Sequence, residues 1–72
     1  MRYASDQDVL SIIRENPGIT TERISIKLYA PECRRDGWYH IIGQLQKLKK
    51  KGLIRGEQDP EIGRARYLWT VV

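Results

Sequence analysis

The segment from Leu45 to Ile54 constrains the fold of this chain more than any other part of it. Leu45 and Leu48 are three residues apart and therefore face one side of a helix, whereas the lysines between and after them project elsewhere. Gly52 follows at the position where the left-handed conformation that ends a helix is cheap only for glycine. The two residues after it are apolar. The sequence therefore predicts a basic amphipathic helix that leads directly into a strand.

A shorter helix is predicted near the start of the chain. Ser5 is a suitable N-cap, and the acidic residues just after it suit the positive end of a helix dipole, so the helix begins near Asp6. Pro17 and Gly18 end this helix, because the residue before a proline is pushed away from the helical conformation. An apolar stripe at helical spacing must be buried; it consists of Val9, Ile12, Ile13 and Asn16, with Leu10 on its flank.

A second helix should follow a very short extended piece at Ile19. Thr20 or Thr21 caps it, and Ile24 and Leu28 point inward. The segment from residue 29 to residue 37 is longer than the connection of a tight helix-turn-helix. We therefore expect an irregular turn or an extra helical turn there.

The third helix is expected to begin at Asp36, as its N-cap, and to reach Lys51. Its apolar arc holds Trp38, Ile41, Ile42, Leu45 and Leu48. Its opposite arc holds Tyr39, His40, Gly43, Gln44, Lys47, Lys50 and Lys51. The opposite arc is polar except for the glycine, and it is the candidate binding surface.

Two strands are predicted after this helix, over Leu53 to Glu57 and Ala65 to Val72, around a polar loop that contains Asp59 and Pro60. In the second strand, Tyr67, Trp69 and Val71 share one face. Tyr67 and Trp69 are expected to fill the core, because a small domain needs their large apolar area.

Length and charge limit the class of protein. A chain of 72 residues makes one domain, residues 1–72, and leaves no room for a catalytic cleft of ordinary size. The net charge of +4 is unevenly distributed: Met1 to Cys33 carries a net charge of −1, and Arg34 to Arg66 carries +5. A positive surface on one side of a molecule attracts polyanions.

The single cysteine excludes an internal disulfide and argues against a secreted, cross-linked scaffold. The first residues lack the apolar core of a signal peptide, and no apolar run approaches the ~20 residues that span a bilayer. These features predict a soluble, cytoplasmic protein that does not associate with membranes.

Catalytic and metal-binding patterns are weak. His40 is the only histidine, and with Cys33 and Asp36 it makes neither a recognisable set of metal ligands nor a nucleophile pair. We therefore expect no enzymatic activity, no metal, no cofactor and no small-molecule ligand. A redox role for Cys33 is disfavoured, because a lone cysteine in a connecting segment is more often a bystander.

The pattern Leu45-x-x-Leu48-x-x-x-Gly52-Leu53-Ile54, followed by Asp59-Pro60, Arg64-Ala65-Arg66 and an apolar strand containing Thr70, carries a resemblance. It resembles the winged helix-turn-helix DNA-binding domains of bacterial and archaeal transcriptional regulators, with MarR-like regulators nearest in the wing. The resemblance implies an α+β fold, in which a three-helix bundle is followed by a C-terminal β-hairpin wing.

MarR-like regulators flank this unit with long dimerisation helices, which we do not expect here because 72 residues leave no room for them. A homodimer of another kind stays open. Stand-alone winged helices of this size look like products of phages, archaeal viruses or mobile elements.

The resemblance implies that Tyr39, His40, Gly43, Gln44 and Lys47 face the major groove and that Arg64 reaches the adjacent minor groove or phosphates. The major groove is about 12 Å wide and admits a helix; glutamine can pair bidentately with adenine, and lysine favours guanine. Gln44 and Lys47 are thus the candidates for base reading. Phosphate contacts are expected from Arg34, Arg35, Lys50, Lys51, Arg66 and the amide groups near Thr21.

The leading hypothesis is a small transcriptional regulator that binds double-stranded DNA, with residues 36–51 in the major groove and residues 55–66 on the adjacent backbone or minor groove.

A glycine in mid-helix, such as Gly43, lowers helix stability by about 0.5 to 1 kcal/mol relative to alanine; it is explained either by close approach of DNA or as a neutral surface position. The alternative function is a winged helix reused as a protein–protein interaction module, with Lys49 to Lys51 as a solvated helix end. Recognition of left-handed nucleic acid fits poorly, because the Pro-x-x-Trp wing of that winged-helix family is absent.

Overall fold

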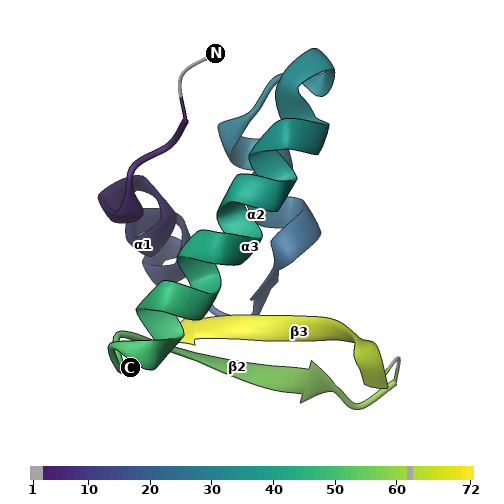
Figure 1. The fold of residues 1–72 in the computed structure, drawn as a ribbon. Helices are drawn as coiled ribbons and strands as arrows, with labels where there is room; N and C mark the ends of the chain where they lie inside the picture. The colour runs from purple at the N-terminus through teal and green to yellow at the C-terminus, as the bar shows by residue number, and fades with distance from the viewer. Residues whose placement is uncertain (1–2, 62) are drawn as a thin grey trace.

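The described residues form three α-helices, a short 3-10 helix and a three-stranded sheet. The computed structural model describes the backbone of residues 3–61 and 63–72, and the side chains of residues 3–61 and 66–72. The elements are, in order, α1 (Asp6–Glu15), β1 (Ile19–Thr20), α2 (Thr21–Leu28), the 3-10 helix η1 (Pro31–Cys33), α3 (Arg34–Lys50), β2 (Ile54–Asp59) and β3 (Gly63–Val71). The helices lie on one side of the hairpin, and α3 crosses in front of α2 in the view of Figure 1.

Helix α1 begins where its capping residues predict. The Ser5 hydroxyl accepts a hydrogen bond from the Asp8 amide at 3.2 Å, and the Asp8 carboxylate accepts one from the Ser5 amide at 3.0 Å. This capping box satisfies two backbone donors that would otherwise lack partners within the helix. At the other end, the Asn16 side-chain amide donates to the Ile12 carbonyl at 2.9 Å. Both ends of α1 are therefore fixed by local hydrogen bonds.

The turn after α1 brings the chain back to the sheet. Gly18 has φ of +83°, a conformation that L side chains rarely adopt, and its amide donates to the Trp69 carbonyl at 2.9 Å. Ile19 then pairs with Trp69 across an antiparallel ladder. Thr20 ends β1 and caps α2, because its hydroxyl accepts from the Arg23 amide at 3.2 Å. The short extended piece and the threonine cap are confirmed.

The connection between α2 and α3 contains the extra helical turn that its length allows. Pro31 opens the turn η1, which leads into α3. The expectation that α3 begins at Asp36 is wrong, since Arg34 and Arg35 already lie inside the helix. Proline presets the backbone angle of a first helical turn, so helical conformation starts earlier than the Asp36 cap predicts. Asp36 lies in the first turn of α3, where a carboxylate suits the helix dipole.

The end of α3 confirms the role of Gly52. This glycine has φ of +77°, and its amide donates to the Lys49 carbonyl at 3.0 Å. The Leu53 amide donates to the Leu48 carbonyl at 3.1 Å. Together these bonds form a Schellman motif, which satisfies the last carbonyls of the helix and turns the chain into β2.

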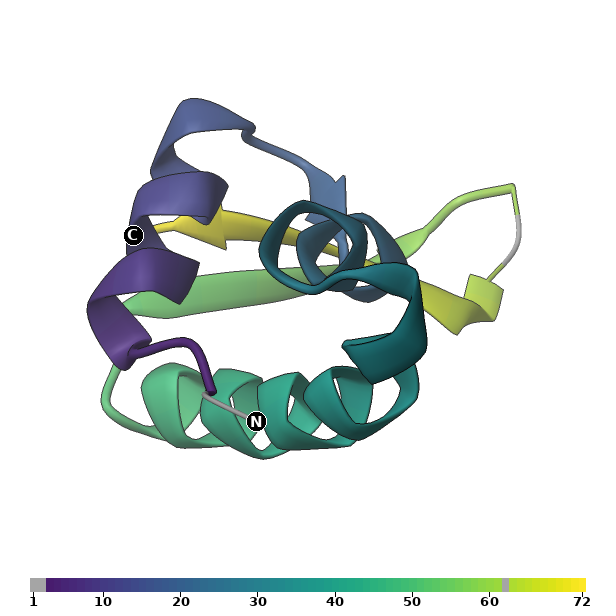
Figure 2. The ribbon, with the colours of Figure 1, turned by 90° about the horizontal axis from the view of Figure 1, so that it is seen from above.

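The three strands form an antiparallel sheet in the order β1-β3-β2. In the hairpin, Ile54 pairs with Val71 and Gly56 with Trp69, and the register shifts near Asp59. Strand β2 begins one residue later and ends two residues later than the sequence predicts. Seen from above, the turn between β2 and β3 extends beyond the helices (Figure 2). This projecting hairpin is the expected wing.

The hydrophobic core lies between the helices and the sheet. It contains residues from all three α-helices and all three strands, with α1 and α3 contributing three each; they are Val9, Leu10, Ile13, Ile19, Ile24, Tyr29, Ile41, Leu45, Leu48, Ile54 and Trp69. Gly37 belongs to this packing, because a Cβ atom there would collide with the Tyr29 ring. No helix in residues 3–61 and 63–72 is long and apolar enough to cross a membrane.

Two aromatic residues that were expected in the core are not buried. Trp38 is 37% exposed and Tyr67 is 38% exposed, whereas Trp69 is 3% exposed. Trp69 also donates from its indole N–H to the Thr21 hydroxyl at 3.0 Å. It lies so close to Gly56 that a Cβ atom there would come within 2.6 Å of its ring. The Tyr67 ring lies beside the Trp69 ring, with 35° between the two ring planes, and remains at the edge of the core.

The difference in burial predicts a difference in stability. Trp69→Ala should lower the free energy of unfolding by about 3 to 5 kcal/mol, because it leaves a cavity and an unpaired Thr21 hydroxyl. Trp38→Ala serves as the matched control and should cost about 1 kcal/mol. Urea unfolding followed by circular dichroism measures both. Equal losses in the two variants would contradict this assignment of the buried face.

Candidate nucleic-acid interface

Helix α3 presents a continuous outward stripe opposite its buried face. Ile41, Leu45 and Leu48 pack into the core, so the residues on the far side of the helix face outward. The side chains and the glycine of this stripe are all exposed; they are Arg35, Tyr39, Gly43, Gln46 and Lys50. The stripe carries positive charge, a ring and an amide, which are groups that contact nucleic acid.

Most of the residues predicted for binding are exposed. Arg35, Tyr39, Gly43, Lys47, Lys50, Lys51 and Arg66 are exposed, whereas Thr21, Arg34 and His40 are half-buried. Arg34 points back toward the connection, where its guanidinium donates to the Tyr29 carbonyl at 3.5 Å. The side chain of Arg64 lies outside the described residues.

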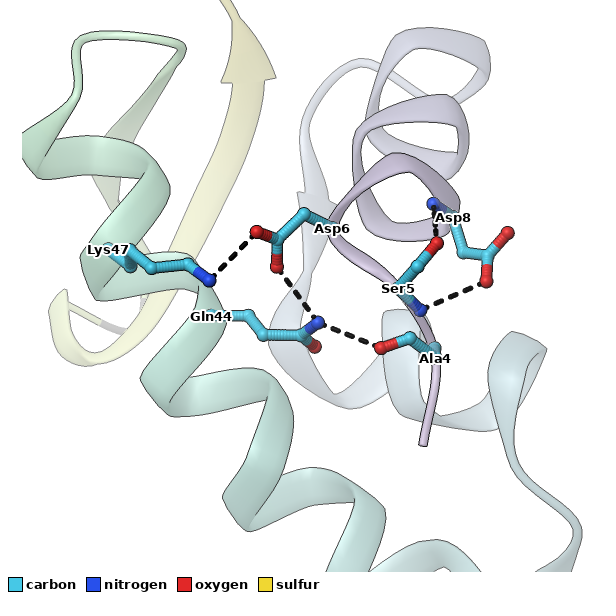
Figure 3. Close-up of polar contacts among 6 residues, drawn as sticks. All are labelled: Ala4, Ser5, Asp6, Asp8, Gln44 and Lys47. Atoms are coloured by element: carbon cyan, nitrogen blue, oxygen red, sulfur yellow. Dashed lines mark hydrogen bonds and ion pairs between the residues drawn. The ribbon is translucent and has the colours of Figure 1, made fainter. Parts of the chain in front are cut away.

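The assignment of Gln44 to the outward arc is wrong. Gln44 is 6% exposed, and its side-chain amide donates to the Ala4 carbonyl at 2.9 Å and to the Asp6 carboxylate at 3.1 Å. Figure 3 shows this amide pointing from α3 toward the start of α1. Gln44 therefore joins two helices and is not available to read a base.

The sequence contained a signal for this outcome. Gln44 follows Ile41 by three residues and precedes Leu48 by four, so it lies on the same side of the helix as two core residues. Its polar side chain suggests the outward arc, but its place in the helical repeat indicates the core side. Gln46, two residues later, is the glutamine that faces outward, and it was not among the predicted binding residues.

Lys47 is partly engaged within the protein. Its ammonium lies 2.8 Å from the Asp6 carboxylate, and about half of its side chain is exposed. The Lys47 ion pair, together with the hydrogen bond from Gln44 and the more distant charge of Lys51, lowers the pKa of Asp6, although burial opposes this shift. A phosphate that binds Lys47 must therefore compete with Asp6.

The N-terminal residues cover one flank of α3. The Tyr3 ring stacks on the His40 ring with centroids 4.3 Å apart. The Ala4 amide donates to the Tyr29 hydroxyl at 2.8 Å. These contacts explain why His40 is half-buried. His40 thus supports the N-terminal segment on the side of α3 that faces α1.

A hollow of about 490 Å³ lies on the other flank of α3. It is bounded by α3, the start of α2 and strand β3. Its lining consists of Thr20, Thr21, Glu22, Trp38, Ile42, Leu45, Gln46, Arg66, Tyr67 and Trp69. The sequence did not predict this hollow, because it depends on how the hairpin packs beside α3. It continues the exposed stripe toward the wing, since Gln46 belongs to both.

The comparison with solved structures agrees with this geometry. A crystal structure of MarR matches with a TM-score of 0.74 and 28% sequence identity, over 93% of this chain. This chain has a winged-helix fold. It spans 44% of the length of the MarR chain that it matches. No protein-family model matches the sequence, and no curated protein sequence matches it.

The winged-helix fold gives α2 and α3 the roles of the helix-turn-helix and gives β2 and β3 the role of the wing. Gly43 lies in the middle of the outward stripe, and a Cβ atom there would meet nothing within 4 Å among the described residues. Packing inside the protein therefore does not explain this glycine. Among the described residues, no group of three or more histidine, cysteine, aspartate or glutamate side chains could hold a metal ion.

The two glutamines of α3 should differ in their effect on stability. Gln44→Ala removes two hydrogen bonds and leaves the Ala4 carbonyl without this donor, so it should lower the free energy of unfolding by about 1 to 3 kcal/mol. Gln46→Ala, the matched control on the same helix, should change it by less than about 0.5 kcal/mol. Chemical denaturation compares them, and an unchanged midpoint for Gln44→Ala would contradict the role of Gln44 as a tie between helices.

The Asp6–Lys47 pair should make stability depend on pH. The pKa of Asp6 is below its ordinary value of 3.8 in the folded chain, so the unfolded chain binds this proton more readily. The pair therefore stabilises the fold above about pH 4, and this contribution disappears as the pH falls through the lowered pKa. Because both side chains are partly exposed, the contribution is at most about 1 kcal/mol.

Asp6→Asn tests this dependence, since asparagine keeps an oxygen for Gln44 but loses the charge. Melting temperatures of the wild type and the variant should differ at pH 7 and converge toward pH 2. Added salt should reduce the difference at pH 7. A difference that stays constant from pH 7 to pH 2 would show that the ion pair is not its cause.

Proposed function

We propose that this chain is a single winged-helix domain that binds double-stranded DNA as a small transcriptional regulator. Helix α3 lies in the major groove, and the β2–β3 wing contacts the adjacent backbone or minor groove. The observation that carries the proposal is the exposed, basic stripe of α3 on a fold similar to that of MarR. The proposal includes no catalytic step and no membrane association.

The spacing of the stripe suits a helix that lies along a groove. Its residues follow one another at intervals of three or four positions, so they form one line along the helix surface. Tyr39, at 60% exposure, and Gln46 lie on either side of Gly43. The open space at Gly43 lets a sugar-phosphate chain or a base edge approach the helix backbone. The first of the two explanations for this glycine is the one consistent with the proposal.

Base reading belongs to Gln46 in this proposal, in place of Gln44. A glutamine amide can pair bidentately with adenine, and Gln46 extends from the exposed face of α3. Phosphate contacts come from Arg35, Lys50 and Lys51 on α3, from Arg66 on the wing and from the first amides of α2 near Thr21. Lys47 contributes after it exchanges Asp6 for a phosphate, and a contact from Arg64 remains a prediction of the sequence.

Salt dependence is the direct test of the proposal. The affinity for a fluorescein-labelled duplex, measured by anisotropy, should fall with rising salt concentration. The logarithm of the affinity should decrease with a slope of about −0.9 for each phosphate contacted. Absence of binding to duplex DNA at low salt would contradict the proposal and favour the alternative function, a protein–protein interaction module. Binding without salt dependence would also contradict it.

Two variants separate base reading from phosphate contact. Gln46→Ala should weaken the binding free energy by about 1 to 3 kcal/mol on a site selected from a random library, and should change binding to a random duplex little. Arg66→Ala should weaken binding to both duplexes and make the salt slope shallower by about one. Arg14→Ala removes the same charge from the exposed face of α1 and is the matched control for Arg66. Equal losses on both duplexes for Gln46→Ala would refute base reading by this residue.

A further inference from the structure

The hollow beside α3 contains partly exposed aromatic surface. Trp38 from α3 and Tyr67 from β3 each expose more than a third of their surface and line the same hollow. Burying an aromatic side chain removes about 150 to 250 Å² from water, so a chain of 72 residues gives up part of that stabilisation at each ring that it leaves partly exposed. Exposed apolar surface of this kind, in a concave site, marks a binding region.

The hollow has the size and the lining of a site for a small planar group. Its volume of about 490 Å³ is within the range of about 300 to 1,000 Å³ that is usual for such sites. Ile42, Leu45 and the buried ring of Trp69 supply its apolar wall. Trp38 from α3 and Tyr67 from β3 both line the hollow, so a flat ring that enters it meets aromatic surface from two elements.

The polar groups of the lining distinguish a base from a phosphate. Gln46 offers both a donor and an acceptor, and Glu22 offers a carboxylate, which accepts a hydrogen bond from the amino group of cytosine and repels a phosphate. Positive charge lies around the rings: Arg66 lines the hollow, and the Lys49 ammonium lies 5.9 Å from the centre of the Tyr67 ring. Basic groups beside exposed aromatic rings are the arrangement that binds unpaired nucleotides.

We propose that this hollow takes up one unpaired nucleobase, so that the α3–wing surface binds DNA carrying an unpaired cytosine more tightly than fully paired DNA. This inference rests on the proposed DNA binding and names the form of DNA that the same surface prefers. A paired base presents only its edges in the grooves, because its faces are covered by its neighbours. A base must leave the stack to lie against Trp38 and Tyr67, and leaving the stack costs least where the base has no partner.

The experiment compares two labelled duplexes that differ by one nucleotide. One duplex is fully paired, and the other carries a single extra cytosine in the middle of one strand. Their affinities for the whole chain are measured by anisotropy at one salt concentration. Stacking on an aromatic side chain should make the bulged duplex bind about 5- to 150-fold more tightly.

Variants of the two rings test the origin of the preference. Tyr67→Ala and Trp38→Ala should each reduce the ratio between the two affinities toward one, whereas Tyr67→Phe and Trp38→Phe keep a ring and should preserve it. Tyr3→Ala removes an exposed ring on the flank of α3 that faces α1 and does not line the hollow, so it should leave the ratio of the two affinities unchanged. Circular dichroism of each variant confirms that it is folded.

The outcomes separate the inference from the proposed function. Equal affinity for both duplexes, with salt-dependent binding intact, would overturn the inference and leave the proposed function standing. A preference that survives both ring-to-alanine changes would also overturn it, because flexibility of the bulged DNA would then be the cause. Failure to bind either duplex at low salt would overturn the proposed function and, with it, the inference.

Discussion

The packing of Trp69 is the constraint on which the rest of the fold depends. Its indole donates to Thr21 at the start of α2, its carbonyl accepts from Gly18 in the turn after α1, and its ring lies against Gly56 of β2. One residue thus joins the helix-turn-helix to both neighbours of β3 in the sheet. The ring of Tyr67 lies next to that of Trp69 at the edge of the core, and both residues line the hollow beside α3. Trp69 thus belongs both to the core and to the wall of this hollow.

A second set of contacts orients α3 from the opposite flank. Gln44 and Lys47 both reach Asp6 at the first turn of α1, and Gln44 also holds the Ala4 carbonyl (Figure 3). Both residues were predicted to face DNA, yet their contacts help to fix the orientation of α3 relative to α1. The exposed glutamine of the outward stripe is therefore Gln46, which lies farther from α1 and nearer to the wing than Gln44 does.

Local signals in the sequence were sufficient for the order of the elements but not for the orientation of residues at the margins of each face. Ser5, Gly18 and Gly52 have their effects through bonds to near neighbours, so their roles could be predicted, and the resemblance to MarR-like regulators gave the correct fold. Gln44, Trp38 and Tyr67 lie at the border between the buried and the exposed sides of their elements. Whether a border residue is covered depends on the placement of α1 and of the hairpin, which residue spacing does not specify.

The short junction after α3 has a mechanical consequence. The Leu53 amide donates to the Leu48 carbonyl at the end of the helix, and the Leu53 carbonyl accepts from the Val72 amide at 3.1 Å. Leu53 therefore connects the end of α3 to the last residue of β3's extension, Val72. Only three residues, 51–53, separate α3 from β2, and they leave no slack for a hinge. Helix α3 and the wing therefore behave as one rigid unit with a fixed relative orientation. In the proposed complex the DNA must bend, or its groove must widen, to contact both at once, so the deformability of a DNA sequence contributes to which sites are bound.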